Sequence, residues 1–398
     1  MQLLDLPLEV FRVIVACTVR KLGLGQSIKV CLVCRLFADA FLDAIITTRV
    51  IEDVNESHSK MIKIQYHHNV IARYLHHRTS TDQSDVHPWI ATIRDTSQML
   101  AQYTKSEHDP AKIELLERSA CSCLAANKGE TVFKELNRQW GYPILSEGGI
   151  EANCLTVAAW MGDMDLVKLL HKGSDPLAFF GRPSWAAATQ GHRDVLQFCL
   201  DEGALPYEPT YKSGPNFALH RSPLAAAAFM GRETIVELYL QQPHYRSEMR
   251  GDGDLAVFFA AQGNQVNTLK MLLDHVKAKA APQDWLSTVD WALICSCRRG
   301  ASASAKIALD YGADINETDR SPRSCLQLAA ISGSAPLVKL LLDAGAPLEA
   351  VDTLRKRSSG RTLQMRRYRD ALFEAKRRGH PQIVQLIEER QQVLAAGT

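Results

Sequence analysis

Apolar residues recur at helical spacing along most of the chain, and residues 326–346 show the pattern most clearly. One short segment begins at Leu326 and ends at Gly333, and a second begins near Pro336 and ends at Gly345. Proline suits a first helical turn, and glycine suits the left-handed residue that follows a last turn. One face of the second segment is apolar: Leu337, Val338, Leu340 and Leu341. The stretch therefore predicts two short helices joined by a tight turn.

The same arrangement recurs along the chain. Each unit has a glycine that closes its predicted first helix: Gly129, Gly162, Gly191, Gly231, Gly263, Gly300, Gly333 and Gly379. Small residues, mostly alanines, precede most of these glycines, and an apolar set follows each in the second helix. The unit after Gly263 fits only if one residue is inserted. Because one helix pair is too small to bury its own apolar face, we expect the pairs to stack on one another.

The glycines are spaced by about 33 residues, which is the period of ankyrin repeats. From about Leu115 to Arg390 the chain resembles the ankyrin repeat family, with paired alanines before Gly333 and a Gly-Ala pair at Gly345. No unit has the full Thr-Pro-Leu-His opening, although the residues from Ser222 come near it. The resemblance implies an all-α ankyrin solenoid of about eight helix-turn-helix units, several of them degenerate, that binds proteins on its concave and hairpin face. A generic array of helical hairpins is the alternative.

Residues 1–50 predict a separate helical module. Asp5 can cap a helix whose first turn contains Pro7 and Glu9, both of which are favoured there. One face of this helix is apolar: Val10, Phe11, Ile14 and Val15. A break is expected at residues 22–25, where two glycines lie, and a second helix is expected over residues 27–46.

The runs Leu6-Pro7-Leu8-Glu9-Val10 and Val33-Cys34-Arg35-Leu36-Phe37 resemble the F-box family. The segment between them is longer than usual, and Phe37 replaces the usual tryptophan. The resemblance implies a surface for the small adaptor subunit of a cullin–RING ubiquitin ligase. Its residues would be Leu6, Pro7, Glu9, Val10, Ile14, Val33, Cys34 and Phe37. The alternative is a helical cap that shields the first repeat.

Residues 51–113 are predicted to form a helical linker, with helices over 61–77 and 88–103, and residues 114–398 to form the repeat domain. Two insertions interrupt the repeats, at 205–221 and 351–368. Insertions in stacked repeats gather on one face, often the binding face. The predicted partner-binding residues are Tyr207, Tyr211, Phe217, Arg355, Arg357 and Arg361. Variable surface loops without a partner are the alternative, and the basic second insertion also fits a nuclear import signal.

Composition narrows the possible functions. The net charge of +2 argues against a whole-molecule nucleic-acid binder, and neither a secretory signal nor a membrane-spanning run is expected. Ten scattered cysteines indicate reduced thiols in the cytoplasm or nucleus. The sequence contains no phosphate-binding glycine loop, no nucleophile-elbow motif and no complete zinc motif, so no cofactor, metal or catalytic residue is predicted. The sequence predicts a non-catalytic protein-interaction protein that serves as a ligase substrate receptor. A plain scaffold, or a nucleic-acid-associated regulator using residues 355–378, is the alternative.

Overall fold

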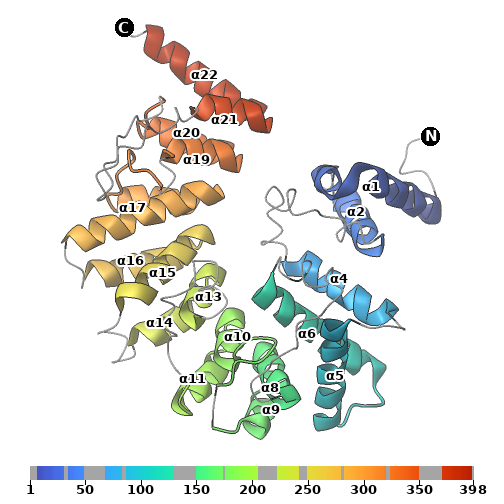
Figure 1. Ribbon diagram of the computed structural model, residues 1–398. Coiled ribbons are helices and arrows are strands. Elements are labelled where there is room, and N and C mark those ends of the chain that lie inside the picture. Colours follow the sequence, from blue (N-terminus) through green and yellow to red (C-terminus); the bar gives the residue numbers. More distant parts are fainter. Residues whose placement is uncertain are drawn as a thin grey trace, which may run out of the picture. The chain divides into compact units, whose positions relative to one another are not determined.

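The computed structural model consists mainly of α-helices in the part of the chain that it describes (Figure 1). The described residues are 7–30, 35–48, 68–82, 87–129, 132, 149–173, 175–204, 222–241, 249–278, 282–319, 323–348 and 370–396. Within these ranges, strand-like pairing is limited to two isolated backbone bridges, Ala178 with Gly181 and Thr318 with Ser324. The all-α prediction is confirmed.

The chain forms two compact units, of which unit 1 comprises Met1–Ala187 with Asp194–Leu205, and unit 2 comprises Ala188–Arg193 with Pro206–Thr398. The helices of unit 1 are α1 (Leu8–Val30), α2 (Arg35–Thr47), α4 (His68–Thr81), α5 (Pro88–Tyr103), α6 (Pro110–Lys128), α8 (Gly149–Met161), α9 (Met164–Leu170), and most of α10 (Pro183–Gln190) and α11 (Arg193–Asp201). The helices of unit 2 are α13 (Pro223–Met230), α14 (Glu233–Gln241), α15 (Met249–Gln262), α16 (Val266–Lys277), α17 (Pro282–Arg299), α18 (Ser302–Asp310), α19 (Cys325–Ser332), α20 (Ala335–Asp343), α21 (Ala371–Arg378) and α22 (Pro381–Ala396). The domain boundaries expected at residues 50 and 113 stay a prediction.

The first helix is longer than the sequence predicts. Helix α1 continues from Leu8 to Val30, so the break expected near Gly23 and Gly25 is wrong. A glycine keeps both backbone hydrogen-bonding groups and costs a helix only about 1 kcal/mol, which a long helix can absorb. The next helix, α2, accordingly begins at Arg35 rather than at residue 27.

The other helices of unit 1 lie close to their predicted positions. Helix α5 has the predicted bounds, and its first turn contains Pro88 after the cap residue His87. Helix α4 is described from His68 and ends at Thr81, beyond the predicted end at His77. Helix α1 packs on α2, α2 on α4, and α4 on α6, so the N-terminal helices continue into the rest of this unit through α2.

Unit 2 consists of helix pairs in which each first helix packs on the next first helix, and each second helix on the next second helix (Figure 1). The first helices are α13, α15, α17, α19 and α21, and the second helices are α14, α16, α18, α20 and α22. In α20, Leu337, Val338 and Leu341 are fully buried, as predicted, whereas Leu340 is only half-buried. This stacking buries the apolar faces that no single pair could cover.

The turn after each first helix follows the predicted glycine pattern with one exception. Seven of the eight glycines have a positive φ, from 52° at Gly129 to 92° at Gly191. Gly263 does not, and Asn264 adopts a φ of 58° in its place. The Gln265 N–H then donates to the Ala260 carbonyl at 3.0 Å, one residue later than in the other turns. Asn264 therefore takes the place of the closing glycine. The apolar positions of α16 then follow at the same offsets as in the other units, so the inserted residue predicted after Gly263 is not needed.

Candidate interaction surfaces

Helix α1 divides its apolar residues between two faces. Phe11, Val15 and Val19 are buried at a spacing of four residues, and they face the packed side of the helix. Val10 and Ile14, predicted as adaptor contacts, are instead 45% and 37% exposed. The apolar face expected for this helix is thus split between a buried side, with Phe11 and Val15, and an open side, with Val10 and Ile14.

The open stripe continues along the helix. Its apolar members are Val10, Val13, Ile14 and Cys17, and all are exposed. Val13, at 62% exposure, is more open than Val10 and Ile14. Pro7 and Glu9, also predicted contacts, are exposed beside the stripe. We name this set of residues, Pro7 to Cys17 on the exposed side of α1, the α1 stripe.

The remaining predicted site residues cannot be placed on a surface. Leu6, Val33 and Cys34 lie outside the described residues, as does the Phe37 side chain within α2. The predicted partner-binding residues of both insertions also lie outside the described ranges: Tyr207, Tyr211, Phe217, Arg355, Arg357 and Arg361. These assignments stay predictions.

Helix α2 attaches the N-terminal helices to the rest of unit 1. Its residues Phe41 and Ile45 are buried, and it packs against both α1 and α4. An exposed ion pair joins Asp43 of α2 to Arg73 of α4. Exposed pairs of this kind contribute little, so the apolar contact is the main attachment. The contact fits the alternative in which the N-terminal module caps the helices that follow.

Side chains in the turns of unit 2 connect consecutive helix pairs. Arg232 Nε donates to the Thr189 carbonyl at 3.0 Å, and Gln265 Nε2 donates to the Phe229 carbonyl at 3.2 Å. Each bond satisfies a carbonyl at the end of the preceding first helix, where no helical partner exists. The turns are therefore held in register by polar contacts as well as by the apolar core.

The loop between α18 and α19 is organised by one buried carboxylate. Asp319, at 1% exposure, accepts hydrogen bonds from the Arg323 backbone N–H at 3.0 Å and from Arg323 Nη2 at 2.7 Å. Arg298 Nη2 of α17 donates to the same carboxylate at 3.2 Å. Two guanidinium groups therefore compensate the burial of this charge, and they fix the loop against the first helix of its own repeat.

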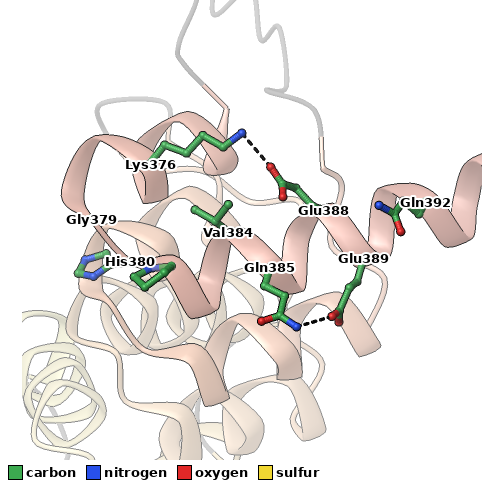
Figure 2. Close-up of a pocket in the computed structure, with 9 residues that line it drawn as sticks. Lys376, Gly379, His380, Val384, Gln385, Glu388, Glu389 and Gln392 are labelled. Atoms are coloured by element: carbon green, nitrogen blue, oxygen red, sulfur yellow. Dashed lines mark hydrogen bonds and ion pairs between the residues drawn. The ribbon is translucent and has the colours of Figure 1, made fainter.

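The C-terminal helix pair forms an open groove of about 510 Å³ (Figure 2). Its walls come from α21 and α22, with His380 at the turn between them. Lys376 pairs with Glu388 at 2.8 Å, and Gln385 donates to Glu389 at 2.8 Å. Four of the polar side chains that line the groove are thus engaged with one another in two pairs.

The described part of the basic stretch is partly neutralised within its own helix pair, because two carboxylates face three cations. Arg377 and Arg378 both contact Glu374, at 2.6 and 3.7 Å, and Lys376 contacts Glu388. Each pair is exposed and individually weak. Together, however, they reduce the positive potential that a nucleic acid would meet at these residues.

Side chains suited to metal or nucleophilic chemistry do not gather in the part of the chain that the structure describes. Among those residues, no group of three or more His, Cys, Asp and Glu side chains could hold a metal ion. The eight cysteines described are free, and all but Cys17 are buried. Burial raises the pKa of Cys295 and of Cys154 to about 12, so these thiols stay protonated and are poor nucleophiles. None of the described helices combines the length and apolarity that crossing a membrane requires.

Comparison with known families identifies the repeats of unit 2. The family model described as ankyrin repeats (3 copies) matches residues 224–319 and 260–352. Residues 224–352 therefore match the ankyrin repeat pattern. The predicted all-α ankyrin fold is confirmed over this region, which spans α13 to α20. Ankyrin repeats are protein-interaction modules, and their presence favours protein binding over catalysis.

Two further similarities concern individual proteins. A protein of Oryza sativa subsp. japonica, named "Probable E3 ubiquitin-protein ligase XBOS33", is 28% identical over 213 residues, which are 50% of this chain. The match covers 39% of the rice protein, so this chain corresponds to well under half of it. The crystal structure of the human ASB11 ankyrin repeat domain aligns with a TM-score of 0.42 and 19% identity, covering 58% of this chain and 96% of that one.

The sequence missed one group of surface residues that the ankyrin repeats bring together. Trp285 at the start of α17 and Tyr311 at the end of α18 lie with ring centroids 6.0 Å apart, next to Lys277 of α16. Their separation in sequence gives no local signal of the contact. Trp285 and Tyr311 meet through the pairing of α17 with α18, and stacking on the preceding repeat places Lys277 beside them.

Proposed function

We propose that this protein is a non-catalytic interaction protein whose ankyrin repeats recruit a protein partner, and whose α1 stripe binds the adaptor subunit of a cullin–RING ubiquitin ligase. The proposal places the protein in the cytoplasm or nucleus, where free cysteines persist. In this role the protein would hold a substrate for the ligase, and another subunit would supply the chemistry.

The observation that carries the ligase link is the exposed apolar spacing on α1. Val10, Val13, Ile14 and Cys17 follow the i, i+3, i+4, i+7 pattern of a helix that docks in a groove of another protein. The opposite face is already occupied by contacts with α2. A helix that served only as a cap would not need a second apolar stripe, because its packing face is complete.

The rice relative supports the same link. Its name places that protein in the ubiquitin system, and the similarity covers half of the present chain. The F-box resemblance of Leu6 to Val10 supplies the expected mode of attachment. Both observations support the proposal by similarity, whereas the α1 stripe supports it by physical chemistry.

The test is capture of the purified adaptor subunit by the full chain and by a Val10→Ser, Ile14→Ser variant. Both side chains are exposed, so the substitutions remove docking area with little effect on folding. We expect adaptor binding to fall by at least tenfold, because losing two apolar contacts in a docked interface costs about 2 kcal/mol or more. Unchanged thermal unfolding, followed by circular dichroism, confirms that the variant is folded.

A matched control uses Val393→Ser, Leu394→Ser in α22, because these side chains are also exposed, at 62% and 51%. This variant should bind the adaptor as the unmodified chain does. If the full chain fails to bind adaptor, or if both variants bind it equally well, the ligase link is refuted. Deleting residues 1–50 would then be expected to lower the stability of unit 1 without changing partner binding, as the scaffold alternative requires.

A further inference from the structure

The Lys277–Trp285–Tyr311 group lies on the surface of the ankyrin repeats. The Lys277 ammonium is 5.7 Å from the centroid of the Trp285 ring and 5.9 Å from that of Tyr311. The two rings are inclined at 54° to each other and both lie near the same ammonium group. We call the surface formed by these two rings the recess. Lys277 is exposed and both aromatic side chains are half-buried, so the recess is open to solvent.

Hydrogen bonding holds the recess in shape. The Tyr311 hydroxyl donates to Asp274 Oδ1, one turn before Lys277 on α16, at 2.8 Å. Desolvation and this carboxylate raise the pKa of Tyr311 to about 12, so the hydroxyl remains a donor at neutral pH. The ring is therefore fixed by a contact that does not involve Lys277, and it keeps its position if the lysine moves away.

The surface beside the recess carries excess negative charge. Asp290, further along the same helix as Trp285, accepts a hydrogen bond from the Asp314 backbone N–H at 2.7 Å. The pKa of Asp290 is raised, first by desolvation and then by its carboxylate neighbours Glu317 and Asp314. Asp290 lies about 7.5 Å from Trp285 along the axis of α17 and about 140° around it, so it is a neighbouring charge and not part of the recess. An incoming cation would relieve this repulsion, whereas an anionic ligand would increase it.

We propose that this recess binds a lysine or arginine side chain of a protein partner, and that Lys277 occupies the recess until the partner displaces it. Aromatic faces attract a cation through their quadrupoles, and tryptophan does so best. The neighbouring carboxylates favour a segment with several basic residues over one with a single cation. Leu286, next to Trp285 and 50% exposed, adds apolar area for the same partner. The inference rests on the proposal that the repeats bind a protein, but not on the ligase link.

The displacement of Lys277 provides a test that a purely structural role would not satisfy. The probe is a fluorescein-labelled peptide with three lysines and three arginines separated by Gly-Ser, and its binding to the full chain is followed by fluorescence polarisation. Lys277→Ala should bind the probe roughly two- to fivefold more tightly, because the resident cation no longer competes. Lys270→Ala is the matched control, since it removes one exposed positive charge from the same helix two turns earlier.

Further measurements separate the aromatic contact from general attraction. Trp285→Leu in the Lys277→Ala background should remove the gain in affinity, and raising the salt concentration should weaken binding overall. A peptide with glutamates in place of the basic residues should bind least. The inference is wrong if Lys277→Ala and Lys270→Ala change the affinity for the basic probe equally. It is also wrong if neither the unmodified chain nor Lys277→Ala binds the basic probe more tightly than the glutamate peptide. If Trp285→Leu still binds the adaptor subunit, its loss of affinity for the basic probe is independent of the proposed ligase link.

Discussion

Asn264 offers a direct test of how one ankyrin repeat fixes the next. It is the only non-glycine residue of the described part of unit 2 with a positive φ, and its side-chain Oδ1 accepts a hydrogen bond from the Ser304 N–H at 3.1 Å. Ser304 is the third residue of α18, whose own cap residue, Ala301, has no side-chain oxygen to offer. Asn264 therefore caps a helix that belongs to the following repeat.

Two substitutions separate the conformational part of this role from the hydrogen bond. Asn264→Gly keeps the left-handed backbone and loses the cap, which costs about 1 kcal/mol of unfolding free energy. Asn264→Ala loses the cap and also strains the backbone, which adds about 1 kcal/mol. The alanine variant should thus be less stable than the glycine variant by about 1 kcal/mol, and less stable than the unmodified chain by about 2 kcal/mol.

The measurement is urea-induced unfolding followed by far-ultraviolet circular dichroism. Asn316→Ala is the control, because Asn316 is exposed and hydrogen-bonds only within its own loop to Asp314. It should change stability by less than about 0.5 kcal/mol. Equal destabilisation by the two Asn264 variants would show that the left-handed backbone conformation adds no strain to an alanine at this position. Unchanged stability in both would refute the capping role.

The remaining predictions concern other parts of the repeats. Asp319→Asn should lower the unfolding free energy by about 2–3 kcal/mol in the same assay, because it leaves the guanidinium groups of Arg323 and Arg298 without a carboxylate. Stability equal to that of the unmodified chain would contradict this prediction. Gly263→Ala should lower the unfolding free energy more than Gly312→Ala. The Cβ at position 263 would lie 2.2 Å from the Phe229 carbonyl oxygen, whereas Gly312 has open space but a φ of 94°, so alanine there adds only backbone strain of about 1–2 kcal/mol. The unfolding free energy should fall between pH 8 and pH 10 in reducing buffer, because the buried Cys295 thiol stays protonated in the folded state but ionises in the unfolded state. Cys295→Ala should reduce this fall by about 1.4 kcal/mol. An unchanged fall in the variant would refute this explanation.

The two proposed binding surfaces lie in different units of the chain. The α1 stripe in unit 1 is apolar and suits a helix-in-groove contact, whereas the recess beside Trp285 in unit 2 is aromatic and acidic and suits a basic segment. Because the two chemistries differ, one partner need not displace the other. A chain that holds a ligase adaptor and a substrate at once requires such independent sites.

The sequence alone determined the repeat pattern because its causes are local. A residue in a left-handed turn is usually glycine, and a helix buried on one face needs apolar residues at helical spacing. Gly333, Leu337 and Leu341 therefore carry their structural roles in their own identities and spacing. The same reasoning failed at Gly23, because a glycine permits a break without requiring one.

Tertiary structure decided which apolar faces are covered and which distant side chains meet. Val10 and Phe11 are both apolar, and only the packing of α1 on α2 leaves one exposed and buries the other. The contact of Lys277 with Trp285 and Tyr311, and the cap that Asn264 provides to Ser304, join residues from successive repeats. Such contacts depend on the spacing and rotation between stacked repeats, which are set by the packing of many side chains together and not by the residues that meet.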